Sequence, residues 1–259
     1  MKGEDAPPPV KRVKKTHSSV DVGAVAAKLA KHVRSDKKLG RACALLRQIV
    51  DSHDSLNEST AGDVFAVLSE IDCRKGRMLE AWAREAVIPL FASVEKRIDV
   101  WNCDAAQARA VAAWVLEARW ANSLSTDDTE TFREAGRKIE KRMDELFAAA
   151  NARAHVVEGI AAAGDDGASE LSPREADAVL SCLGVAQRHF VHHWARTSVN
   201  ALFLKASLNR ERFSAAQRTE LDAMSTQLQA ARDGADRKRV SKAWLKSDSQ
   251  AMTHPLRRL

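Results

Sequence analysis

Residues 171–207 read LSPREADAVLSCLGVAQRHFVHHWARTSVNALFLKAS. Ser172 is the predicted helix N-cap, Pro173 occupies the first helical position and Glu175 completes a capping box. Apolar residues follow at helical spacing on both sides of a short break that we expect near Gly184. They are Ala176, Val179, Leu180 and Leu183, then Phe190, Val191, Trp194, Ala195, Val199, Leu202 and Phe203. One helical hairpin is too small to bury its own apolar faces, so the stretch predicts one unit of a stack.

The same kind of helix start occurs four times, as a large apolar residue directly before an N-cap residue. The four pairs are Leu56-Asn57, Trp101-Asn102, Leu171-Ser172 and Phe213-Ser214. In the first three, an alanine (Ala61, Ala106 or Ala176) stands at the fourth helical position, where a staple contact forms. The starts are 45, 70 and 42 residues apart. This recurrence predicts an all-α fold of stacked antiparallel helix pairs, an α-solenoid-like array wound to the right or to the left.

Further helices are expected along the chain. The apolar stripe Val22, Val25, Ala26, Leu29 and Val33 predicts a short amphipathic helix with Lys28, Lys31 and Arg34 on its other side. We expect it to dock on the body, because its stripe is small, and the alternatives are a membrane surface and an acidic partner. Long helices are predicted over 77–98, with Trp82 in the apolar stripe and a kink at Pro89, and over 128–150 and 214–232. Shorter helices are expected near 152–163 and around Val240 and Trp244, and a loop over 164–167.

Composition argues against a disordered chain, a disulfide-linked framework and a membrane-spanning helix. The chain has 259 residues, 45% of them hydrophobic, with only 11 glycines and 6 prolines, which indicates a folded chain with a core. The four cysteines (Cys43, Cys73, Cys103 and Cys182) form no Cys-x-x-Cys pair and are expected to be reduced and mostly buried. The longest apolar run, 110–116, is far short of the roughly 20 residues that a membrane helix needs.

Charge is distributed unevenly. The net charge is +6, but residues 1–40 and residues 237–259 each carry an excess of six positive charges, and residues 41–236 carry an excess of six negative charges. We therefore divide the chain into a basic N-terminal arm with a short amphipathic helix (1–40), a helical-repeat body (41–236) and a basic C-terminal tail (237–259).

The first 19 residues leave several interpretations open. Three prolines at 7–9 favour an extended segment, and a basic cluster follows at 11–15. The cluster is typical of a solvated tail, of a nuclear localisation signal or of an arm that lies along phosphates. An organellar transit peptide is a further alternative, although Glu4 and Asp5 are atypical of one. A secretory signal is not expected, because no apolar segment follows the charges.

The sequence shows no pattern of an active site. It lacks phosphate-binding glycine loops, the Gly-x-Ser-x-Gly elbow and the His-Glu-x-x-His motif. His189 and His193 lie four residues apart on an expected helix face, but nearby carboxylates to complete a metal site are absent. We predict no enzyme activity, no catalytic residue, no metal and no cofactor.

The helix pairs resemble the degenerate α-helical repeats of organellar RNA-associated proteins, of the FAST-kinase/RAP type or the octotricopeptide-like type. The resemblance rests on Leu171 to Leu183 and, more loosely, on 57–68 and 102–116. No RAP domain follows the repeats and no regular pair of base-reading positions is present. The resemblance implies a helical-repeat fold and an organellar RNA setting without sequence-specific readout.

These observations predict a non-catalytic RNA-associated component of an organellar ribonucleoprotein, foremost the mitochondrial ribosome in the matrix. The acidic body would contact neighbouring proteins, and the basic ends would contact RNA phosphates independently of sequence. The predicted phosphate contacts are Lys11, Arg12, Lys14, Lys15, Arg237, Lys238, Arg239, Lys242 and Lys246. The alternatives are a nuclear or cytoplasmic location, and a protein-interaction scaffold or accessory subunit without RNA, in which Trp101 or Trp120 would anchor a partner.

Overall fold

The computed structural model describes residues 21–73, 76–101, 104–158 and 170–251, with side chains omitted over 154–158 and 235–251. This part of the chain is all-α, as the sequence predicts. The α-helices are α1 (Val22–Val33), α2 (Asp36–Asp51), α3 (Glu58–Asp72), α4 (Ala81–Lys96), α5 (Ala105–Val115), α6 (Thr129–Glu158), α7 (Pro173–Arg188), α8 (Arg196–Leu208) and α9 (Ala215–Ala251). A π-helical segment, η3 (Leu116–Ala121), continues α5. Short 3₁₀ turns are η1 (Arg77–Leu79), η2 (Ile98–Trp101), η4 (His189–Val191) and η5 (Arg210–Arg212).

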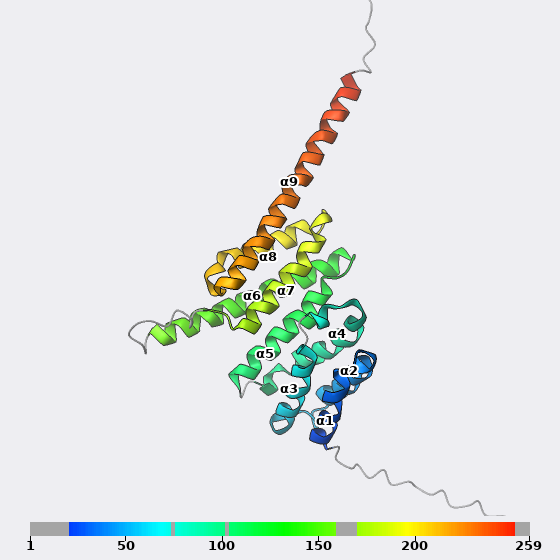
Figure 1. The fold of residues 1–259 in the computed structure, drawn as a ribbon, viewed down its shortest axis with the longest axis vertical. Helices are drawn as coiled ribbons and strands as arrows, with labels where there is room; N and C mark the ends of the chain where they lie inside the picture. The colour runs from blue at the N-terminus through cyan, green and yellow to red at the C-terminus, as the bar shows by residue number, and fades with distance from the viewer. Residues whose placement is uncertain (1–20, 74–75, 102–103, 159–169, 252–259) are drawn as a thin grey trace, which may run out of the picture.

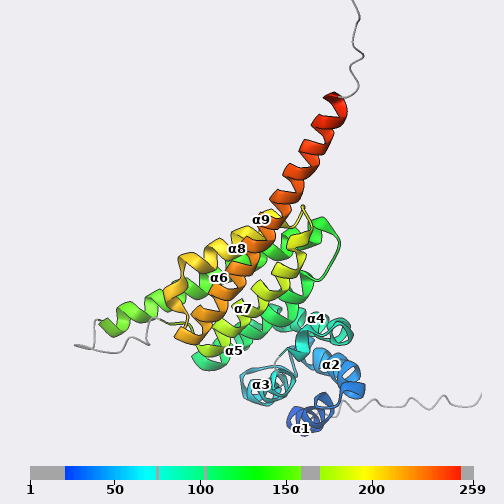
Figure 2. The same cartoon turned by 45° about the horizontal axis from the view of Figure 1, so that its top comes forward.

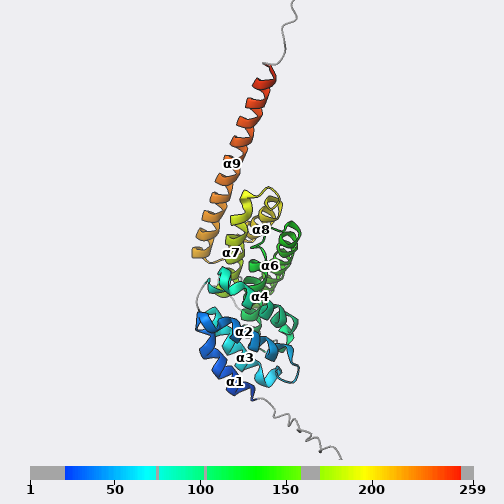
Figure 3. The same ribbon diagram turned by 90° about the vertical axis from the view of Figure 1, so that its right-hand side faces the viewer.

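The helices form a stack in which most pack on the helix two places further along the chain, whereas α4 packs on α5 and η3 instead of α6. The odd-numbered helices contact one another in order, α1 with α3, α3 with α5, α5 with α7 and α7 with α9, while α2 packs on α4 and α6 on α8 (Figures 1 and 3). This arrangement buries each helix pair against the next pair, as in an α-solenoid. The helix α1 lies at one end of the long axis, and the C-terminal part of α9 projects from the other end (Figures 1 and 2).

One continuous apolar core runs through the stack, from Val22 in α1 to Leu228 in α9. Trp101 is fully buried, and its indole N–H donates to the carbonyl oxygen of Ala61 in α3 at 3.2 Å. Trp114 packs on Phe65, with ring centroids 5.0 Å apart. The helix α1 docks on α2 and α3 through its buried face, as the sequence predicts.

Three of the four recurring helix starts stand at the predicted residues. Asn57 caps α3, and Ser172 caps α7 in a capping box, where Glu175 N donates to Ser172 Oγ at 3.3 Å and Ser172 N donates to Glu175 Oε2 at 2.8 Å. Ser214 directly precedes α9, and its backbone N–H donates to the Gln217 side chain. The remaining prediction is wrong, since Asp104 rather than Asn102 caps α5. This cap leaves Ala106 exposed instead of stapled.

Several predicted boundaries are wrong for identifiable reasons. No break occurs at Gly184, because α7 continues to Arg188 and the chain turns only afterwards. The helix expected over 77–98 is divided into η1 and α4, with Pro89 inside α4. Trp82 does not lie on the buried face of α4, where the stripe predicts it; its side chain is 47% exposed, and its indole N–H donates to the Glu80 carboxylate.

Two predicted pairs of helices are each one helix. The helix α6 runs unbroken over Thr129–Glu158, and α9 runs unbroken over Ala215–Ala251 through the expected boundary at 236. The loop expected over 164–167 lies outside the described residues. Within the described ranges, no helix is both long and apolar enough to cross a membrane.

Candidate functional site

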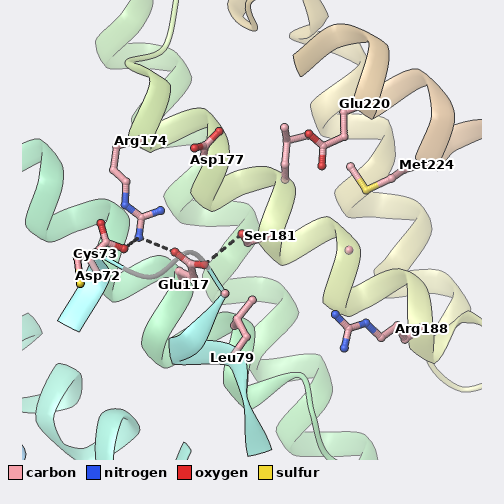
Figure 4. Close-up of a pocket in the computed structure, with 13 residues that line it drawn as sticks. Asp72, Cys73, Leu79, Glu117, Arg174, Asp177, Ser181, Arg188, Glu220 and Met224 are labelled. Carbon is pink, nitrogen blue, oxygen red and sulfur yellow. Dashed lines mark hydrogen bonds and ion pairs between the residues drawn. The ribbon is translucent and has the colours of Figure 1, made fainter. Parts of the chain in front are cut away.

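A cleft of about 570 Å³ opens between the end of α3, the π-segment η3 and the α7 and α9 helices (Figure 4). Three charged side chains from different elements meet there. Asp72 is the last residue of α3, Glu117 lies on η3 and Arg174 lies in the first turn of α7. Figure 4 shows Arg174 placed between the two carboxylates.

Asp72, Glu117 and Arg174 pair with one another in this cleft. Arg174 Nη2 lies 2.6 Å from Asp72 Oδ1 and 2.5 Å from Glu117 Oε2. Ser181 Oγ donates to the other oxygen of Glu117 at 3.2 Å. Glu117 is only 4% exposed, so its carboxylate depends on these partners, because a buried charge without a partner is costly. Arg174 Nε is buried without a hydrogen-bond partner among the described residues. The network joins α3, η3 and α7, and we interpret the cleft as a structural junction.

The π-segment explains how a glutamate becomes buried. All but one of its six residues are buried, including Glu117 and Trp120 on successive turns. A π-bulge changes the direction of side chains relative to a regular helix and is common at functional sites. The sequence contained one indication that Glu117 is buried, because this residue directly follows the long apolar run 110–116.

The two buried cysteines of the described chain are not activated nucleophiles. Cys43 and Cys182 are buried free thiols and Cys73 is an exposed one, whereas Cys103 lies outside the described residues. Burial raises the pKa of Cys43 to about 12, and it raises the pKa of Cys182 well above its ordinary value. Thiols with raised pKa values are poor nucleophiles at neutral pH.

The histidines near Trp194 do not share a helix face, so the prediction for His189 and His193 is wrong. His189 lies in the η4 turn, and His193 lies in the irregular turn that follows. His189 packs on Phe132 at a centroid distance of 5.2 Å, while His192 stacks on Trp194 at 5.3 Å. Burial is the main cause that lowers the pKa of His189. Over the described residues, no three His, Cys, Asp or Glu side chains are grouped to hold a metal ion.

The predicted phosphate-binding residues fall into two groups. Lys11, Arg12, Lys14 and Lys15 lie outside the described residues. Arg237, Lys238, Arg239, Lys242 and Lys246 lie on α9, in the part of the helix that leaves the body (Figure 1). Three of these positions, 238, 242 and 246, follow one another at intervals of four residues, so they share one side of the helix.

A third basic region includes Lys28 and Lys31, which the sequence places on the polar side of the first amphipathic helix. It covers α1 and α2, and we name it the α1–α2 basic surface. Its members are Lys28, Lys31, Lys37, Lys38 and Arg41, all exposed. None of the five forms an ion pair with another described residue, whereas many cations of the body do, such as Arg142 with Glu95 at 2.9 Å and Lys205 with Asp144 at 2.6 Å. The packing of α1 on α2 places Lys37, Lys38 and Arg41 of α2 in one groove with Leu29 and His32 of α1.

The junction of Asp72, Glu117 and Arg174 differs from the α1–α2 basic surface, since its charges pair within the protein, whereas the five cations of that surface form no ion pair with another described residue. Function has to be argued from this charge layout, because no family model, no curated protein and no solved structure matches the chain.

Proposed function

We propose that this protein is a non-catalytic, RNA-associated structural component of a ribonucleoprotein, whose basic ends contact RNA phosphates and whose helical body contacts neighbouring proteins. The observation that carries the proposal is the charge layout, with an excess of six positive charges at each end and six negative charges between them. The placement of α1 and the end of α9 at opposite ends of the long axis supports it (Figure 1).

The physical basis is counterion release. Each RNA phosphate that a lysine or arginine neutralises releases condensed cations, so affinity falls steeply as salt rises. The cations of the body are less suited to this role, because ion pairs such as Arg119 with Glu95 already neutralise many of them. The proposed contacts are sequence-independent, since phosphates carry no base information.

The cellular setting is a finer part of the same proposal. The resemblance of the helix pairs to organellar RNA-associated repeats suggests a place in the mitochondrial ribosome, in the matrix. The test of this part is the set of molecules that co-purifies with the tagged native protein from isolated mitochondria. We expect ribosomal RNA and ribosomal proteins, and one defined protein partner without RNA would contradict the setting.

The test of RNA binding is its salt dependence. Replacing Arg237, Lys238, Arg239, Lys242 and Lys246 by glutamine keeps the length of α9 and removes its charge. For a labelled 30-nucleotide polyuridine, we expect the slope of log affinity against log salt to become less steep by about 0.7 for each lost contact. Deleting residues 1–19 should reduce the slope further.

A matched control replaces the exposed body cations Arg133, Arg137 and Lys141 by glutamine. Their side chains are 57%, 69% and 75% exposed, and each has a carboxylate partner within 4.0 Å. We expect this control to leave the slope unchanged. An unchanged slope in the end variants, or no RNA affinity of the intact chain at low salt, would contradict the proposal.

A protein-interaction scaffold without RNA is the second candidate, favoured by exposed apolar residues on α8. Leu204 and Leu208 lie one turn apart and are 62% and 71% exposed. Trp101 and Trp120, the aromatic anchors considered from the sequence, are buried in the core instead. In a scaffold, Leu204→Ser with Leu208→Ser would release a protein partner, and the glutamine variants of α9 would not.

A further inference from the structure

A groove between α1 and α2 combines positive charge with an apolar floor. Its volume is about 510 Å³, and it is lined by Leu29, His32, Lys37, Lys38, Arg41, Ala42 and Leu45. Leu29 and Ala42 are almost fully buried and form the floor, while Leu45 is 42% exposed at its edge. The basic side chains surround this floor and are exposed.

The register of α2 produces this combination. Leu39, Ala42, Cys43, Leu46 and Val50 are buried on the side of α2 that faces the core. Lys38, Arg41 and Leu45 recur at intervals of three and four residues, which places them together on the outer side. Leu45 is therefore an exposed large apolar residue among cations rather than part of the core.

The position of the groove in the stack makes it open to a partner. The helix pair of α1 and α2 is the first described unit, and a terminal unit of a helical stack normally presents a polar outer face. The carboxylate next to Lys37 in the chain is engaged elsewhere, since Asp36 pairs with Arg77 at 2.9 Å. The lysines and Arg41 thus keep their charge available.

We propose that this groove binds an acidic segment of a partner protein, with an apolar side chain against Leu45 and carboxylates on Lys37, Lys38 and Arg41. Charge complementarity selects an acidic occupant, and the apolar floor selects one with an apolar side chain. RNA fits less well, because the apolar floor of Leu29 and Ala42 gives nothing to a phosphate, and His32 is the one ring among the lining residues on which a base could stack. The proposal is independent of the nine residues proposed above for RNA.

Fluorescence anisotropy with defined probes tests the proposal on the full chain. The probe is a labelled 15-residue peptide of glutamate and aspartate with two leucines four residues apart, and its control has serine in place of both leucines. We expect the leucine peptide to bind at least tenfold more tightly than the serine peptide. A tenfold change in Kd is about the free energy of burying part of one leucine side chain. Leu45→Ser should remove most of this difference, and K38E with R41E should weaken both peptides.

Two comparisons distinguish the alternatives. K141E changes an exposed lysine of α6 and should leave peptide binding unchanged. A 15-nucleotide polyuridine and phosphatidylserine vesicles should bind wild-type protein and the L45S variant equally. Three results would each overturn the proposal. The first is equal binding of the two peptides, and the second is an L45S variant that binds them as wild type does. The third is a K38E/R41E variant that loses more RNA or vesicle binding than peptide binding. All substituted residues are exposed, so circular dichroism should match that of the wild-type protein.

Discussion

At the scale of single residues, this protein depends on a few buried charges that have specific partners. Arg77 is 3% exposed, and it donates to the carbonyl oxygen of Val33 at 2.6 Å and to Asp36 at 2.9 Å. Glu175 is 1% exposed and completes the cap of α7. Glu117 is held by Arg174 and Ser181. Each of these groups connects two segments that are distant in the sequence or fixes the start of a helix.

Replacing Arg174 by glutamine should lower the free energy of unfolding by about 2–4 kcal/mol, because it leaves the buried carboxylate of Glu117 without its cation. Urea unfolding followed by circular dichroism measures this change. The matched control is Arg47→Gln, which removes an ion pair whose side chains are 51% and 49% exposed and should change stability by less than about 0.5 kcal/mol. Similar effects of the two substitutions would show that the junction at Glu117 is not needed for stability.

His189 should make stability depend on pH between about 7 and 5. Its pKa is lowered in the folded protein, mainly by burial and then by the charge of His192, while Asp127 opposes the shift and Arg188 and Arg84 add to it. The unfolded chain therefore takes up more protons as the pH falls below about 6.5, and the folded state loses stability there.

Urea unfolding of wild-type protein and of His189→Phe at pH 8, 6.5 and 5 tests this expectation. The phenylalanine variant should lose less stability than wild type between pH 8 and pH 5. Carboxylates with lowered pKa values, such as Glu70 and Asp222, destabilise the protein only at lower pH, near the ordinary range of carboxyl groups. The same pH dependence in both proteins would rule out His189 as its source.

At the scale of elements, local signals fix where helices start more reliably than where they end. The capping box of Ser172 and Glu175 satisfies backbone groups at the start of α7, and Leu171 N donates to the carbonyl oxygen of Arg212 at 2.8 Å. The end of the same helix lies beyond Gly184, where a Cβ would meet nothing within 4 Å. A glycine inside a helix lowers its stability without ending it, and tertiary packing keeps the helix intact.

Ser172→Ala should lower the free energy of unfolding by about 1 kcal/mol, the usual loss for a removed N-cap. The control is Ser207→Ala on the exposed side of α8, where we expect no loss. Thermal unfolding measured by circular dichroism gives both values. An equal change in the free energy of unfolding for the two variants would mean that the N-cap of α7 does not stabilise the folded protein.

Gly234→Ala should strengthen α9 where it leaves the body. A Cβ at this position meets nothing within 4 Å, and alanine is more favourable than glycine in a helix interior by about 1 kcal/mol. We expect slower amide hydrogen exchange in the following turns of α9 and unchanged exchange in α3, α5 and α7. Faster or unchanged exchange after residue 234 would contradict the continuous helix.

At the scale of the whole molecule, α1 and the C-terminal part of α9 lie at opposite ends of the long axis (Figure 1). If both ends bind one RNA, a long RNA gains from simultaneous contact, whereas a short RNA reaches only one end. Full-length protein should therefore bind a 60-nucleotide polyuridine more tightly per site than a 10-nucleotide one. The glutamine variant of α9 should lose this preference for length, and a preference that persists in the variant would show that the ends act separately.

By itself, the sequence determined the class of fold, the helix starts at Asn57 and Ser172, and the charge difference between ends and body, because caps, periodicity and charge are local properties. Only the tertiary structure decided which charged residues are buried and which remain available. Glu117 and Arg174 are 57 residues apart in the chain, and Trp82, which the apolar stripe places in the core, is exposed. The grouping of Lys37, Lys38 and Arg41 with Leu29 likewise arises from the packing of α1 on α2. The physical reason is that burial and pairing depend on neighbours that the fold supplies, which no local pattern specifies.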